Sequence, residues 1–171
     1  MKQLRQLKRY AIAGILFVLF VGTLSHFLYE WTGRNVIVGL FVPVNESVWE
    51  HMKLLFFPML LYSAGMAFQL KSSFPCVVSA LCFGILIGTA CIPVFFYVYT
   101  FILGTNVFVL DLAIFLFGTV IAFLTAYLLT RSCRFSAYTG LLCVLVCILF
   151  LCFAVFTYYP PDLAVFIPMD S

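Results

Sequence analysis

The sequence predicts an all-α fold: a polytopic integral membrane protein, with a bundle of about five transmembrane helices in a single domain at residues 1–171. Hydrophobic residues make up 65% of the chain and charged residues only 9%, whereas a soluble domain carries about 25% charged residues. Apolar runs long enough to cross a bilayer recur along the whole chain. This composition excludes a soluble domain of any size.

Each apolar run predicts a membrane-spanning helix, because backbone N–H and C=O groups inside a bilayer must be satisfied within the protein. Two prolines stop the last helix. The tail beyond them is too apolar to be a free segment, so we expect it to lie along the membrane surface, where it could cover polar residues. The expected spans and tail cover about residues 10–29, 46–68, 75–100, 107–130, 137–157 and 158–171.

The charged residues predict the orientation of these spans. With five spans, the basic residues before the first span and in the second and fourth connections fall on one side: Lys2, Arg5, Lys8, Arg9, Lys71, Arg131 and Arg134. The acidic residues and both histidines fall at the other ends of the spans. Because basic residues favour the cytoplasmic side, we expect a multi-pass plasma-membrane protein with its N-terminus inside and its C-terminus outside.

The seven cysteines are predicted to be packing residues rather than a disulfide framework. Cys76 and Cys133 lie beside apolar runs, and the others lie within them: Cys82, Cys91, Cys143, Cys147 and Cys152. The odd count and the lack of paired CxxC spacing in the sequence give no support for a zinc knuckle. Buried free cysteines commonly serve as small, polarizable packing groups.

The polar residues of the outer side gather around one stretch, PVNESVWEHMK at residues 43–53. His26 and Glu30, four residues apart, share one face at the outer end of the first span. We therefore expect a polar pocket at the extracytoplasmic leaflet, walled by the first, second and fourth spans. The residues expected to bind a ligand there are Asn45, Glu46, Trp49, Lys53 and Asp111.

Three interpretations of this pocket stay open, and the first is structural. Ser47 and Glu50 fit a capping box, in which their side chains satisfy free amides at the start of the second span. An unpaired ammonium at the depth of Lys53 is costly. We therefore expect Lys53 to form an ion pair with Glu50 or Asp111.

The second interpretation is a metal site, and the third is metal-free chemistry. Imidazole and carboxylate groups are ligands for zinc, iron or manganese, and the candidate ligands are His26, Glu30, Glu50, His51 and, less directly, Asp111. Without a metal, a half-buried Glu50 beside His51 could transfer protons at neutral pH. Glu50 and His51 are thus the catalytic candidates.

PVNESVWEHMK, HFLYEW at 26–31 and YYPPDLAVF at 158–166 resemble the pattern of an uncharacterised family of small, multi-spanning bacterial membrane proteins. The resemblance extends over most of the chain. It implies a bacterial cytoplasmic membrane and a bundle of about five helices. It implies no activity, substrate or catalytic residue.

The function expected first is binding of a small polar molecule, ion or lipid headgroup in the pocket. The alternative is a small membrane enzyme, a hydrolase or transferase at the outer leaflet. A transporter subunit comes third, because the sequence places no charge near the midplane of the spans. The expected partner is the lipid bilayer, a homo-oligomer or a membrane partner stays open, and no nucleic acid is expected.

Overall fold

The computed structural model describes residues 2–168, and within this range it is all-helical. Five of its helices are long and apolar enough to cross a membrane, as the sequence predicts. These are α1 (Lys2–Trp31), α3 (Val48–Leu70), α4 (Val77–Leu103), α5 (Phe108–Ser132) and α6 (Thr139–Phe156). Three short elements accompany them: α2 (Val36–Gly39) and the 3₁₀ turns η1 (Ser136–Tyr138) and η2 (Ala164–Phe166).

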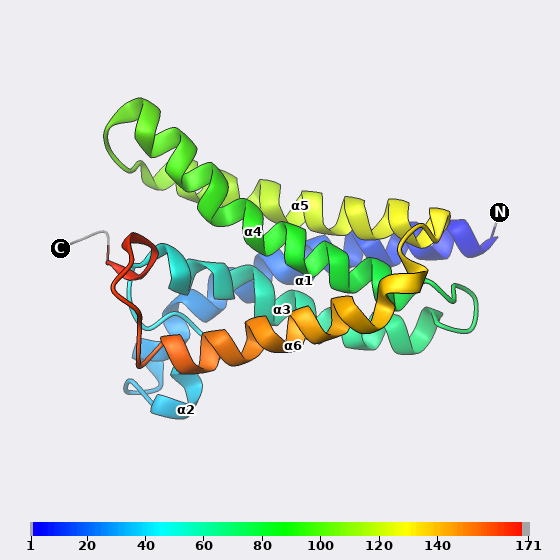
Figure 1. Cartoon of the computed structure of the whole chain (residues 1–171), viewed down its shortest axis with the longest axis horizontal. Helices are drawn as coiled ribbons and strands as arrows, with labels where there is room; N and C mark the ends of the chain where they lie inside the picture. The colour runs from blue at the N-terminus through cyan, green and yellow to red at the C-terminus, as the bar shows by residue number, and fades with distance from the viewer. Residues whose placement is uncertain (1, 169–171) are drawn as a thin grey trace.

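The long helices run along one axis, and consecutive ones are antiparallel (Figure 1). The N-terminus, the α3–α4 connection and the α5–α6 connection lie at one end. The α1–α3 connection, the α4–α5 turn and the C-terminal tail lie at the other end. The basic connections thus share the end of the N-terminus, which is the arrangement that the charge pattern requires.

Helix boundaries follow local capping. α1 begins near the start of the chain rather than at residue 10, because Lys, Arg, Gln and Leu in its first turns are good helix formers. Asn35 caps α2 by accepting hydrogen bonds from the amides of Ile37 and Val38. α4 ends where Gly104 adopts a left-handed conformation, φ 73°, which glycine tolerates without strain.

Small residues bring the helix backbones together. A Cβ atom on Gly88 of α4 would lie only 2.5 Å from the Cβ atom of Ala122 on α5. A Cβ atom on Gly22 of α1 would lie 2.4 Å from the carbonyl oxygen of Leu54 on α3. Close approach through small residues is a common way for membrane helices to pack. Gly84 and Gly88, which are four residues apart on α4, therefore both lie in the α4–α5 contact.

One sequence prediction is wrong: Cys76 and Cys133 form a disulfide, with their Cα atoms 5.3 Å apart. These residues are 57 positions apart in the sequence. They meet because Cys76 precedes α4, Cys133 follows α5, and the two helices pack antiparallel. Sequence spacing carries no information about that contact, which depends on the pairing of the helices. The five cysteines within the apolar runs are free.

Candidate functional site

Two polar clusters diverge from the first turn of α3. Glu50 and His51 are adjacent in the sequence, so their side chains leave the helix about 100° apart. Glu50 points into the protein and is 1% exposed, whereas His51 keeps 21% of its side chain exposed. We call the group around Glu50 and Lys53 the closed cluster, and the group of His26, Glu46 and His51 the open cluster.

The closed cluster is a buried ion pair with its hydrogen-bonding capacity taken up by the protein. The Lys53 ammonium, 0% exposed, donates to Glu50 Oε2 at 2.8 Å. It also donates to the carbonyl oxygens of Gly39 at 2.9 Å and Val42 at 3.4 Å. Its three donors therefore have three acceptors. Lys53 thus fastens the α1–α3 connection to α3, and its ion-pair partner is Glu50, one of the two expected.

The Glu50 carboxylate extends this network to two further segments. Oε2 also accepts a hydrogen bond from the amide of Val44 at 2.9 Å, and Oε1 accepts one from the Thr157 hydroxyl at 3.1 Å. Thr157 follows α6, so one carboxylate joins the start of α3, the preceding connection and the end of α6. This arrangement leaves Glu50 away from the pocket described below, whose lining does not include it.

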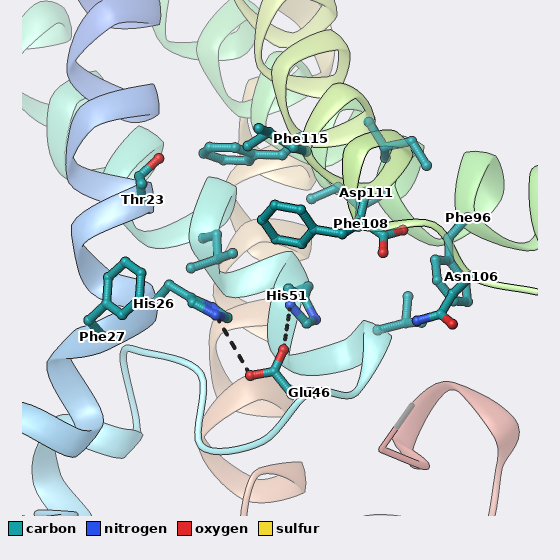
Figure 2. A pocket seen from close by; sticks show the side chains of 15 residues that line it. Thr23, His26, Phe27, Glu46, His51, Phe96, Asn106, Phe108, Asp111 and Phe115 are labelled. Atoms are coloured by element: carbon teal, nitrogen blue, oxygen red, sulfur yellow. Dashed lines mark ion pairs between the residues drawn. The ribbon is translucent and has the colours of Figure 1, made fainter. Parts of the chain in front are cut away.

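The open cluster brings two imidazoles to one carboxylate. His51 Nε2 lies 3.2 Å from Glu46 Oε2, and His26 Nε2 lies 3.7 Å from Glu46 Oε1. Figure 2 shows both rings turned toward Glu46, one from α1 and one from α3. The two rings are stacked, with centroids 5.6 Å apart. Each of the three residues offers one possible ligand atom, and these three atoms all lie within 4.8 Å of one another.

Hydrogen bonding fixes the role of each His51 nitrogen. Nδ1 lies 2.9 Å from the carbonyl oxygen of Ser47, and a carbonyl can only accept, so Nδ1 carries a proton. Nε2 then faces a carboxylate either as a second N–H donor or with its lone pair. A bare lone pair opposite a carboxylate oxygen is repulsive. The Glu46–His51 contact therefore requires a proton or a cation at Nε2.

Charge favours the ionised form of Glu46. The hydrogen bond from His51 holds the pKa of the Glu46 carboxyl below its ordinary value of 4.5. Partial burial acts in the opposite direction and raises this pKa, whereas Coulombic attraction to both histidines lowers it further. Glu46 is accordingly a carboxylate at neutral pH. It offers one oxygen to each imidazole.

The open cluster lies in the wall of a pocket with a volume of about 480 Å³. Asp111 and Asn106 line the side of the pocket opposite His26 and Glu46 (Figure 2). Asp111 accepts a hydrogen bond from the Tyr99 hydroxyl, which in turn accepts one from the amide of Val107. The remaining lining is mostly apolar. The pocket thus has a polar part at the start of α3 and an apolar floor.

The other expected site residues have structural surroundings. Glu30 pairs with Arg34 on the surface at 3.0 Å and is absent from the open cluster. Asn45 accepts a hydrogen bond from the amide of Ser47 at 2.9 Å. Ser47 caps α3 by accepting from the amide of Glu50 at 3.3 Å. The Ser47 half of the expected capping box is confirmed, while Asn45 takes the place of Glu50 at the Ser47 amide.

Trp49 and the tail pack against each other rather than over the pocket. The Trp49 ring lies 4.7 Å from the ring of Phe153 and 4.9 Å from that of Phe166 in η2, centroid to centroid. Pro168 forms an isolated bridge with Ser47. The tail therefore returns to the start of α3, as expected of an apolar segment, but none of its described residues, 158–168, lines the pocket.

Sequence reasoning expected His26, Glu46, His51 and Asp111 in one pocket, and all four line it. It did not identify Glu46 as the carboxylate that contacts both histidines. A sequence model of a family of unknown function, DUF6512, matches residues 1–170. The chain belongs to this family. No curated protein and no solved structure matches the chain. Membership in DUF6512 thus agrees with the resemblance to an uncharacterised family and assigns no activity to the pocket.

Proposed function

We propose that this membrane protein binds a divalent transition-metal ion in its pocket through His26, Glu46 and His51. The observation that carries the proposal is the His51 geometry: Nδ1 is bound by the Ser47 carbonyl, and Nε2 faces Glu46 at 3.2 Å. Histidine ligands usually donate their second ring N–H to a backbone carbonyl or carboxylate in this way. A cation between Nε2 and the carboxylate would replace the repulsion between lone pairs with two coordinate bonds.

The ligand set restricts the choice of metal. Two imidazoles and one carboxylate suit zinc, iron or manganese. Three protein ligands leave coordination positions for water or substrate, which is typical of catalytic rather than structural metal sites. Those positions would face the pocket, because the cluster forms part of its wall. A metal-dependent hydrolase or transferase is therefore the activity that this arrangement favours.

The second candidate is metal-free binding or acid–base chemistry by Glu46 and His51. Their 3.2 Å contact supports it, because a protonated His51 also satisfies the same geometry. Glu50 supports neither candidate as a reacting group, because its two oxygens are bound within the closed cluster. In both candidates the working carboxylate is therefore Glu46.

We place the open cluster at the extracytoplasmic leaflet of a bacterial cytoplasmic membrane, with the N-terminus inside. Lysines and arginines concentrated at the end of the bundle that holds the N-terminus support this orientation. The Cys76–Cys133 disulfide lies at the same end and counts against it, because disulfides are rare in a reducing cytoplasm. Fusion of alkaline phosphatase after residue 171 tests it. We expect an active fusion, and an inactive one would contradict the orientation without bearing on the metal site.

The metal proposal is tested by elemental analysis of protein purified through a tag without histidine. We expect about one zinc, iron or manganese ion per chain in the wild type and far less in His51→Ala. Glu30→Gln is the matched control, because Glu30 lies at the same end of the bundle but pairs with Arg34. Absence of metal from the wild type after growth and dialysis with each of the three metals, or equal metal in His51→Ala, would refute the proposal.

A further inference from the structure

The pocket has two chemically distinct parts. Leu54, Ile92 and Phe115 form its apolar floor and are each less than 10% exposed. The polar part holds the open cluster together with Asp111 and Asn106. A volume of about 480 Å³ falls in the range of small-molecule sites, roughly 300–1,000 Å³. A ligand that fills it must therefore be polar at one end and apolar at the other.

Part of the pocket lining, which we call its rim, consists of exposed apolar side chains. Phe27 on α1 is 48% exposed, and Phe108 and Leu112 on α5 are 77% and 52% exposed. All three side chains line the pocket, and both helices are membrane-spanning candidates. In a bilayer, such exposed side chains on the outside of a helix bundle contact lipid. The pocket is thus bounded by residues that lipid chains can reach.

Helix packing explains why the pocket opens on this side. Deeper in the bundle, α1 and α5 are in direct contact: a Cβ atom on Gly22 would lie 2.6 Å from the Phe115 ring, and one on Gly14 would lie 2.3 Å from the Phe123 ring. Toward the α4–α5 turn, α4 and α5 lean away together from α1, α3 and α6 (Figure 1). The pocket lies beyond the Gly22–Phe115 contact, where the helices separate.

We infer that the pocket takes a membrane amphiphile from the bilayer between α1 and α5, with an anionic oxygen of its head group at the metal and its chain on the apolar floor. This inference rests on the proposed metal site. Without a cation, Glu46 and Asp111 would repel an anionic head group, whereas a metal with open positions attracts phosphate or carboxylate oxygens. An amphiphile also explains why a site with metal-binding side chains has an apolar floor and a lipid-facing rim.

The test uses Co²⁺-loaded protein in dodecyl maltoside micelles, whose head group carries no phosphate, because the visible spectrum of Co²⁺ responds to a new ligand. Decyl phosphate and methyl phosphate are titrated separately, so that a chain-bearing head group is compared with the same head group free in water. We expect decyl phosphate to change the spectrum at a concentration at least tenfold lower. Leu112→Trp narrows the rim and should remove this preference.

Leu116→Trp is the matched control, since Leu116 is an exposed leucine one turn further along α5 that does not line the pocket. It should behave as the wild type, which would show that the preference does not arise from simple partition of decyl phosphate into the micelle. Bound Co²⁺ with equal responses to both phosphates, or a preference that survives in Leu112→Trp, would overturn the amphiphile inference alone. Failure of the protein to bind Co²⁺ would instead refute the metal site, and the inference with it.

Discussion

The closed and open clusters begin one residue apart on α3 and differ in how completely the protein satisfies them. Glu50 and Lys53 are 1% and 0% exposed, and their polar atoms bind one another, three backbone groups and Thr157. Glu46, His26 and His51 are partly exposed and line a pocket. The difference indicates two roles for charged residues in this apolar chain. The closed cluster holds the α1–α3 connection, α3 and the end of α6 together, while the open cluster leaves its side chains in the wall of a pocket.

The largest expected effect comes from breaking the closed cluster. Lys53→Met leaves the Glu50 carboxylate buried without its cation, and such a loss typically costs about 3–5 kcal/mol. We expect a large fall in thermal stability in detergent, or failure to fold. Adding Glu50→Gln should recover part of the loss, because it removes the uncompensated charge. Equal thermal stability of wild type and Lys53→Met would show that the pair is not structural.

Neutralising the two glutamates separately sharpens the comparison. Glu46→Gln should weaken metal binding by more than about tenfold, since even groups that only support a ligand are worth that much, and should destabilise the metal-free protein less than Glu50→Gln does. Glu50→Gln should do the reverse, lowering stability while the folded protein keeps its metal. Isothermal titration with Zn²⁺ and thermal unfolding of the same samples measure both. Loss of metal affinity in Glu50→Gln alone would reverse the assignment of the clusters.

The open cluster also predicts a pH dependence for the metal-free protein. Folding lowers the pKa of Glu46 below 4.5, so Glu46 stabilises the fold above that value, and the contribution is lost as pH falls through the lowered, folded pKa. Between about pH 5 and pH 3 the melting temperature of the wild type should therefore fall more steeply than that of Glu46→Gln. Parallel curves for the two proteins would contradict the pairing of Glu46 with the histidines.

The smallest effect is expected outside both clusters. Glu30→Gln removes an exposed ion pair with Arg34, with side chains 63% and 71% exposed, and pairs of this kind contribute about 0–1 kcal/mol. We expect a shift in melting temperature within experimental error and unchanged metal content. A marked loss of metal in this variant would restore Glu30 to the ligand set and require a rearrangement of the end of α1.

The fold was largely predictable from local properties. Hydropathy and length indicate the five long helices, and lysine and arginine place their connections on alternate ends. Helix α2 and the early start of α1 were missed, because α2 is too short and the first turns of α1 are too polar to give a membrane-span signal. Glu50 was one of two predicted partners of Lys53, because it lies three residues away on the same helix.

The candidate site was predictable only in part. The sequence alone determined that His26, Glu46, His51 and Asp111 lie at one end of the bundle, because hydropathy and charge set where each span begins and ends. Only the tertiary structure decided that Glu46 meets both histidines, that Glu50 turns inward, and that Cys76 reaches Cys133. The physical reason is that hydropathy and charge patterns fix the depth of a residue in the membrane. The neighbour that it meets depends on helix pairing and on the path of the α1–α3 connection.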